Sequence, residues 1–170
     1  MSMKPNLLII GFGMYGSVVK EIAEATKRFG EIAFLDDTVK SEQVVGNFSD
    51  YKKFFKDYNF AIPALGNPNI RREWTEKLES AGYQIPVLLH PNAYVSPSAQ
   101  IAKGTVIEPM AVVHANTTIN KGCIISVGAV INHNCMVGSF CHVNCNAILG
   151  AATVLDDGIK VGCGEVIGQR

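Results

Sequence analysis

Residues 95–170 decide the fold, and in groups of six they read VSPSAQ, IAKGTV, IEPMAV, VHANTT, INKGCI, ISVGAV, INHNCM, VGSFCH, VNCNAI, LGAATV, LDDGIK, VGCGEV and IGQR. The first letter of every group, from Val95 to Ile167, is Val, Ile or Leu. The fifth letter is mostly Ala, Thr or Cys. Because neither a helix nor an ordinary strand has a period of six, the pattern indicates a repeat architecture.

Each group of six can supply one short flat face, with its aliphatic first letter pointing inward and its small fifth letter beside the corner. Three faces close a coil of 18 residues, and residues 95–170 provide about four such coils. Stacked coils of this kind bury a continuous apolar column, so we expect a β-helix in this half of the chain.

The residues before the repeat alternate between strand and helix patterns. We expect strands at 6–11, 31–37, 59–66 and 85–89, and helices at 16–30, 49–58 and 67–82. Gly30 and Gly82 would close two of the helices, Ser49 or Asp50 would cap the short one, and Pro68 lies in a first turn. This alternation predicts a small Rossmann-like parallel α/β domain over residues 1–86, followed by the β-helix over residues 87–170.

Composition excludes several classes of protein. Fifteen basic residues balance fifteen acidic ones, which argues against a nucleic-acid partner or an anionic membrane surface. The start, MSMKPNLLIIGFGMYG, is too short for a membrane span and lacks a signal-peptide cleavage site. The five cysteines form no CxxC pair, so we interpret them as small hydrophobes of a cytoplasmic protein without a metal site.

His133, the third letter of its group, has the chemistry of a general base. Third letters vary widely along the repeat, which indicates an outward or groove-facing position. An imidazole there can take a proton near neutral pH, as acyl transfer from a thioester to an amine requires. Ala151 follows 18 residues later, one coil up on the same face, and its backbone N–H is the candidate donor to the oxyanion.

Five segments resemble one known family: GFGMYG at 11–16, FLDD at 34–37, LGNPNIRR at 65–72, INHNCM at 131–136 and GSFCHVN at 138–144. With the repeat, they are similar to the hexapeptide-repeat acetyltransferases that modify nucleotide amino sugars or sialic acids. The similarity is greatest to enzymes that acetylate a UDP-4-amino sugar in bacillosamine-type glycan synthesis. The resemblance implies a left-handed β-helix and a homotrimer with acetyl-CoA lying along the coils between neighbouring subunits.

The same resemblance assigns roles in the β-helix. It makes His133 the catalytic base and places His142 near the thioester or the trimer interface. Asn134 occupies a position that is often acidic in the family and that would orient the base. Relatives usually continue to a GNPA-like segment that helps to hold CoA, whereas this sequence stops at Arg170 inside the repeat. We expect either that the sequence is a truncated version or that its CoA site is incomplete.

In the first half, the resemblance implies a nucleotide-sugar site. Its expected residues are the glycine loop, the acidic pair that meets the nucleotide base, and a segment near the sugar: Gly11, Gly13, Tyr15, Gly16, Asp36, Asp37, Asn67 and Arg71. Tyr15 stands where relatives often have His. The residues alone also fit NAD, since Asp36 follows Gly16 by 20 residues. However, 86 residues suit a mononucleotide such as UDP better than a dinucleotide.

The leading hypothesis is therefore an acetyl-CoA-dependent N-acetyltransferase that acts on the 4-amino group of a UDP-linked amino-deoxy sugar. One alternative is an O-acetyltransferase on a sugar such as sialic acid, which the same base and thioester would serve. An alternative of another class is a non-catalytic trimer that only binds a nucleotide. Of the remaining histidines, His114 carries a weak functional signal and His90 belongs to the connector between the domains.

Overall fold

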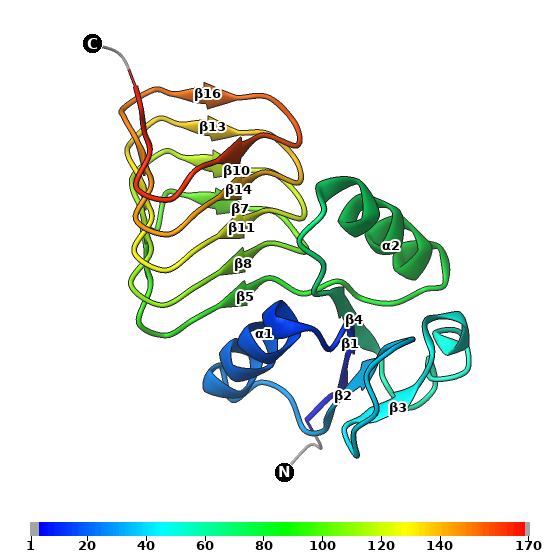
Figure 1. Ribbon diagram of the computed structural model, residues 1–170. Coiled ribbons are helices and arrows are strands. Elements are labelled where there is room, and N and C mark those ends of the chain that lie inside the picture. The colour runs from blue at the N-terminus through cyan, green and yellow to red at the C-terminus, as the bar shows by residue number, and fades with distance from the viewer. Residues whose placement is uncertain (1–3, 169–170) are drawn as a thin grey trace. The chain divides into compact units, whose positions relative to one another are not determined.

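The computed structural model describes residues 4–168. They form two compact units, one up to Pro86, here called the α/β unit, and one from Val87 onward, here called the β-helix unit. Figure 1 shows the elements of each unit. None of the helices in residues 4–168 has the length and apolar character needed to cross a bilayer.

The α/β unit is built on a four-stranded parallel sheet. Its strands are β1 (Leu7–Ile10), β2 (Ile32–Leu35), β3 (Val44–Gly46) and β4 (Phe60–Pro63), in the order β3-β2-β1-β4. Helix α1 (Met14–Ala25) follows β1, and helix α2 (Pro68–Ser80) follows β4. The chain thus moves outward from β1 through β2 to β3 and then returns to the other side of β1. The order of the strands therefore reverses between β1 and β4, and open α/β sheets bind ligands at the carboxyl ends of the strands beside such a point.

Two helix predictions in this unit need correction. Helix α1 ends at Ala25, before the predicted stop at Gly30, because Lys27 already adopts the left-handed conformation with φ of 56°. Residues 49–58 form no α-helix. A single 3-10 turn, η1 (Phe48–Asp50), is capped by Asn47, and irregular turns follow it. There the Tyr51 carbonyl accepts a hydrogen bond from the Tyr83 hydroxyl, so a tertiary contact replaces a helical one.

The strand predicted at 85–89 was also assigned to the wrong sheet. The fourth strand of the α/β sheet is β3, which the sequence reading missed, while Gln84 makes only an isolated bridge to Phe60. Strand β5 (Leu88–Leu89) instead pairs with β8 (Val106–Ile107) in the β-helix unit. Leu89 lies six residues before Val95, so the coils begin one repeat earlier than Val95.

The β-helix unit is a left-handed parallel β-helix, whose stacked coils are seen in Figure 1. Its strands are two residues long. Its strands form three parallel stacks with partners 18 residues apart, as the repeat predicted. The first stack is β5, β8, β11 (Ile124–Ile125), β14 (His142–Val143) and β17 (Lys160–Val161). The second is β6 (Tyr94–Val95), β9 (Val112–Val113), β12 (Val130–Ile131), β15 (Ile148–Leu149) and β18 (Val166–Ile167). The third is β7 (Gln100–Ile101), β10 (Thr118–Ile119), β13 (Met136–Val137) and β16 (Val154–Leu155).

The interior of the coils follows the six-residue pattern. First letters from Ile107 to Val161 are buried and form one apolar column, with the small fifth letters packed between them. Cys123, Cys135 and Cys141 are fifth letters of this core, and their thiols donate hydrogen bonds to backbone carbonyls. These three cysteines therefore act as small core residues.

Fourth letters turn the corners with positive φ angles. The residues in this conformation are Gly104, Met110, Asn116, Gly122, Gly128, Asn134, Phe140, Asn146, Ala152, Gly158 and Gly164. Gly and Asn adopt the left-handed region at the lowest cost, which explains why they prevail at this position. The recurrence of Gly and Asn at fourth letters is therefore a further sequence signal of the coil, beside the first and fifth letters.

Candidate functional site

His133 lies on the corner that follows β12, and its side chain is exposed. Its Nδ1 is 3.0 Å from the amide oxygen of Asn134. An amide oxygen can only accept a hydrogen bond, so this contact places the ring proton on Nδ1 and the lone pair on Nε2. The arrangement presents Nε2 as the atom that can take a proton.

Two asparagines hold the backbone around His133. The His133 N–H donates to the Asn132 side-chain oxygen at 2.8 Å. Asn134 has φ of 61°, and its N–H donates to the Ala115 carbonyl of the coil below at 2.9 Å. Because Asn tolerates the left-handed conformation, it can hold the corner and the imidazole at once. The His114 ring lies 6.0 Å from the His133 ring, centroid to centroid.

Ala151 lies one coil above His133, where the Ala152 N–H donates to the His133 carbonyl at 2.9 Å. In two other groups of six the N–H of the third letter is capped by the preceding asparagine, as the Asn144 side chain caps Cys145. The residue before Ala151 is Gly150, which has no side chain. Within residues 4–168 no acceptor is found for the Ala151 N–H. A donor in this state is suited to a developing oxyanion.

His142 belongs to a different stack, in strand β14, and is half-buried. Its Nε2 is 3.0 Å from the Ser126 hydroxyl, which also contacts Glu108. The sequence analysis missed Glu108 and Ser126. The signal that could have found them is a pair of polar second letters separated by one coil, 18 residues apart.

In the α/β unit, the structure brings the expected nucleotide residues to the carboxyl ends of three neighbouring strands. The glycine loop follows β1, the acidic pair follows β2, and the segment with Asn67 and Arg71 follows β4. Gly16 is required by packing, because a Cβ there would lie 2.3 Å from the Gly11 carbonyl oxygen. Gly13, the N-cap of α1, faces open space, and no side chain caps the helix.

Asp36 is tied to the backbone of its own unit. It is 7% exposed and accepts hydrogen bonds from the N–H groups of Phe12, Thr38 and Val39 and from the Thr38 hydroxyl. Burial alone would raise the pKa of Asp36, but these hydrogen bonds outweigh it and lower the pKa from 3.8 to about 2. The carboxylate therefore joins the glycine loop to the turn after β2.

The other predicted residues of this unit are also engaged locally. The Asp37 carboxylate accepts from the Phe48 N–H, and Asn67 caps α2 by accepting from two backbone N–H groups. Arg71 is 2% exposed and donates to the Leu65 and Gly66 carbonyls. Tyr15 is half-buried within α1, and its hydroxyl is buried. Direct contact of these side chains with a nucleotide stays a prediction.

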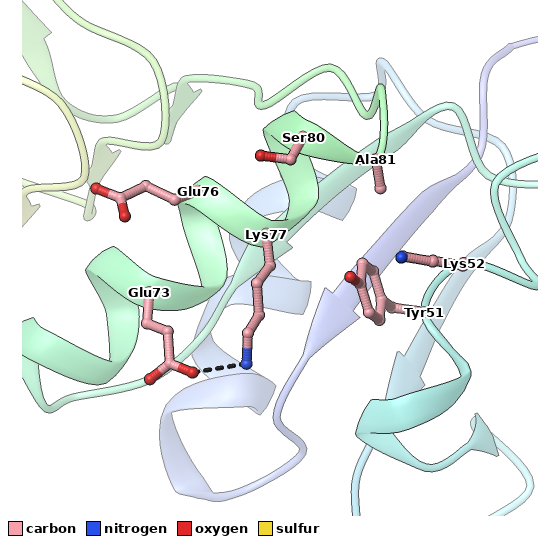
Figure 2. Close-up of a pocket in the computed structure, with 7 residues that line it drawn as sticks. All are labelled: Tyr51, Lys52, Glu73, Glu76, Lys77, Ser80 and Ala81. Carbon is pink, nitrogen blue, oxygen red and sulfur yellow. Dashed lines mark hydrogen bonds and ion pairs between the residues drawn. The ribbon is translucent and has the colours of Figure 1, made fainter.

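A pocket of about 290 Å³ lies on α2 and the turn at Tyr51. Figure 2 shows Glu73 and Lys77 of α2 pointing toward each other, with Tyr51 on the other side of Lys77. The pocket includes none of the residues that the sequence analysis assigned to a site. Its lining mixes acidic and basic side chains without a common chemistry, so we assign it no role.

Comparison with known proteins identifies relatives for both units. Residues 6–78 match the family model of the PglD N-terminal domain. The UDP-N-acetylbacillosamine N-acetyltransferase of Bacillus subtilis (strain 168) is 34% identical over 110 residues, which cover 60% of this chain and 50% of that protein. The chain thus spans about half the length of this curated relative.

Solved structures match almost the whole chain. The acetyltransferase domain of PglB from Neisseria gonorrhoeae FA1090 has a TM-score of 0.89 at 32% identity, covering 96% of this chain and 91% of that chain. The same domain in complex with acetyl coenzyme A matches with a TM-score of 0.83 at 31% identity, covering 97% and 93%. Perosamine N-acetyltransferase from Caulobacter crescentus, in complex with CoA and GDP-perosamine, has a TM-score of 0.84 at 21% identity over 98% and 90%, a likeness of fold.

Proposed function

The chain belongs to the sugar N-acetyltransferases built on a left-handed β-helix of hexapeptide repeats, and we propose that it transfers the acetyl group of acetyl-CoA to the 4-amino group of a UDP-linked amino-deoxy sugar. The name of the Bacillus relative supports UDP as the nucleotide. The structural observation that carries the proposal is His133, exposed, with its Nδ1 held by Asn134 and with the Ala151 N–H one coil above.

His133 acts as the general base. The amine nitrogen attacks the carbonyl carbon of the thioester and gives a proton to Nε2 of His133. The new C–N bond is then complete, the C–S bond breaks, and the proton passes to sulfur, so that CoA leaves as the thiol. A neutral imidazole accepts this proton on the ring nitrogen that carries the lone pair.

The Ala151 N–H stabilises the oxyanion of the tetrahedral intermediate. Its position one coil above His133 and the missing cap at Gly150 support this role. Preorganised backbone donors contribute strongly to acyl transfer because the charge on oxygen develops only in the transition state.

The nucleotide diphosphate binds at the N-terminus of α1. Gly13 leaves room for close approach, and no acidic residue lies in the first turn of the helix. Uncapped N–H groups and the helix dipole favour an anion there. Asp36, Asn67 and Arg71 fix the shape of the three surrounding loops. Asp37 is exposed, so of the acidic pair it is the residue that contacts the nucleotide base in this proposal.

The active protein is a homotrimer joined through the second stack of the β-helix unit. The outward sixth letters of this stack are all apolar or aromatic: Tyr94, Val112, Val130, Ile148 and Val166. Three of them are exposed large hydrophobic residues, as expected for a surface that a second copy covers. We place the protein in the cytoplasm, where its free cysteines would stay reduced.

Release of CoA thiol tests the proposal directly. Acetyl-CoA is mixed with UDP-4-amino sugars, a GDP-4-amino sugar or sialic acid, and the wild type is compared with His133→Ala. We expect the wild type to release CoA thiol in the presence of a UDP-amino sugar. We expect His133→Ala to lower the rate of this release by at least about a hundredfold. His90→Ala, which changes a histidine of the first coil directly after β5, is the matched control. Release only with sialic acid would support the O-acetyltransferase, and absence of acetyl-CoA binding would support the non-catalytic trimer.

Two substitutions at Gly150 test the oxyanion donor separately. A Cβ at this position lies 3.0 Å from the Cα of Gly168, so Gly150→Ala and Gly150→Asn share the same steric cost. Only Asn can cap the Ala151 N–H, as Asn132 caps His133. We expect Gly150→Asn to lower kcat by about tenfold or more relative to Gly150→Ala. Equal rates in the two variants would remove the Ala151 N–H from the mechanism.

A further inference from the structure

Two buried polar residues of the β-helix unit, Glu108 and Ser126, form a hydrogen-bonded chain that ends on His142. The Ser126 hydroxyl donates to one Glu108 carboxylate oxygen at 3.4 Å, and it lies 3.0 Å from Nε2 of His142. The other Glu108 oxygen accepts the Val127 N–H at 2.9 Å. Glu108 is 7% exposed and Ser126 is 4% exposed.

The stacking of coils places these groups together. Glu108 and Ser126 are second letters 18 residues apart, so they occupy the same column in successive coils. His142 is a sixth letter of the same stack, paired with Ile124 in β11, and its column continues down to Val106. Val106 and Ile124 are buried aliphatic residues, so His142 replaces an apolar side chain in this column.

A buried carboxylate is costly unless it is hydrogen-bonded, and here it is bonded on both oxygens. The column does not require an acid, because the equivalent second letters of its other coils are His90, Asn144 and Gly162. The cost of burying Glu108 therefore points to a role beyond packing. The group on which the chain converges is the imidazole of His142.

We infer that Glu108 and Ser126 fix the tautomer of His142, with its proton on Nε2. The Ser126 hydroxyl donates its proton to a Glu108 carboxylate oxygen. The Ser126 oxygen then accepts, and His142 must donate to it from Nε2. In the neutral ring, Nδ1 consequently carries the lone pair. Glu108 and Ser126 are positioning residues that act through His142.

The functional consequence rests on the proposed acetyl transfer. If His142 meets the thioester end of acetyl-CoA, the Nε2 proton is committed to Ser126, and Nδ1 is the ring atom that interacts with the co-substrate. A flipped or rotating ring would offer a donor and an acceptor in turn. Fixing one tautomer therefore lowers the cost of binding acetyl-CoA in a single orientation.

Nitrogen NMR of the ¹⁵N-histidine-labelled full chain tests the tautomer without any substrate. Spectra are recorded near pH 8, where an ordinary imidazole is neutral, and His142 is assigned by comparison with His142→Gln. We expect the Nε2–H form in the wild type. A wild-type His142 in the Nδ1–H form would overturn the inference, whether or not the protein is an acetyltransferase.

Three variants test the order of the chain. Ser126→Ala removes the acceptor and should give a mixture of tautomers, while Ser126→Thr keeps the hydroxyl and should retain Nε2–H. Glu108→Gln can donate to the Ser126 oxygen, which should shift His142 toward Nδ1–H. Ser96→Ala, at a buried second letter of another stack, is the matched control. An unchanged tautomer in both Ser126→Ala and Glu108→Gln would overturn the inference.

The kinetic readout separates positioning from structure. Ser126→Ala should raise the KM for acetyl-CoA by about three- to tenfold, the equivalent of one hydrogen bond, and Ser126→Thr should restore it. The KM for the sugar should stay unchanged. Equal effects on both KM values, without rescue by Thr, would indicate a structural role only. If the wild type shows no transfer, the proposed function fails while the NMR result still decides the tautomer.

Discussion

The corner at His133 and the loop at Asp36 are held in place by different means. The backbone around His133 is fixed by hydrogen bonds to the coils below and above, at Ala115 and Ala152. The loop around Asp36 is fixed by the Asp36 side chain itself, which bonds to backbone N–H groups on either side of it. In the β-helix unit, the fold does not depend on the His133 side chain. In the α/β unit, polar side chains stabilise the loops by hydrogen bonds to backbone groups.

This difference separates polar residues that stabilise the fold from polar residues whose side chains are available for chemistry. In the α/β unit, Asp36, Asn67 and Arg71 all hold the loops in which they lie. Substituting them should change stability before it changes any contact with a ligand. In the β-helix unit, stability resides in the apolar column, so an exposed corner residue can be changed at little structural cost.

The largest effect on stability is expected from a charge placed in the apolar column of the β-helix unit. Ile131→Asp should abolish folding of the β-helix unit, at a cost of more than about 3 kcal/mol, because Ile131 is fully buried and a carboxylate there has no partner. Circular dichroism and thermal unfolding measure the effect. Val154→Asp, at an exposed sixth letter, is the control and should unfold like the wild type. Normal unfolding of Ile131→Asp would show that the first letters do not carry the stability.

Asp36→Asn should cost about 2 kcal/mol at pH 7. The amide group would oppose a backbone N–H with a donor, where the carboxylate accepts on both oxygens. Because the pKa of Asp36 is lowered to about 2, the stabilisation is present above about pH 4 and is lost as the pH falls toward 2. Urea unfolding at pH 7 and near pH 2.5 measures the difference between variant and wild type, which should shrink at low pH.

The control for this pH dependence is Glu42→Gln, which removes the same charge at an exposed position. It should leave the free energy of unfolding within about 0.5 kcal/mol of the wild type. A pH-independent loss in Asp36→Asn would mean that the carboxylate contributes through shape and not through its charge.

Asn134→Ala should cost about 1 kcal/mol, because Ala is less favourable than Asn at φ of 61°. Asn134→Gly keeps the backbone relaxed and should be close to the wild type in stability. Both variants lose the contact with Nδ1 of His133 and should lose transferase rate to a similar extent. Thermal unfolding beside thiol release separates the two duties of Asn134. Full activity in Asn134→Gly would show that the amide does not orient the base.

The smallest structural effect belongs to His133→Ala. Its free energy of unfolding should lie within about 0.5 kcal/mol of the wild type, since the side chain is exposed and is not a core letter. Urea unfolding is the measurement, made on the same preparation used for thiol release. A large loss of stability would show that the His133 side chain stabilises the fold, as the Asp36 side chain does, and would contradict the comparison.

The β-helix could be predicted closely from sequence because the place of a residue in the six-residue repeat determines whether its side chain points inward or outward. The first and fifth letters gave the coil of 18 residues and the core, and the exposed His133 followed from the variability of third letters. The first coil was missed because Leu88 and Leu89 resemble an ordinary apolar strand. Their place in the stack depends on pairing with Val106 and Ile107, which is not a local property.

The α/β unit was less predictable because its irregular parts depend on tertiary contacts. Lys27 ends α1 in a conformation that the sequence pattern assigned to Gly30. Residues 48–58 have helical spacing, but the Tyr51 carbonyl bonds to Tyr83, which lies 32 residues away. The duties of Asp36 and Arg71 were likewise hidden, because their partners are backbone atoms whose positions only the fold determines.

The spacing of 18 residues between His133 and Ala151 has a consequence for how this protein can change its length. An insertion or deletion between them keeps Ala151 in the His133 column only if it adds or removes a multiple of a whole coil. A change of six would preserve the apolar column yet rotate Ala151 to another face. Insertions and deletions should therefore be tolerated outside this interval or as bulges at corners. The spacing of 18 residues itself should be constrained by the site.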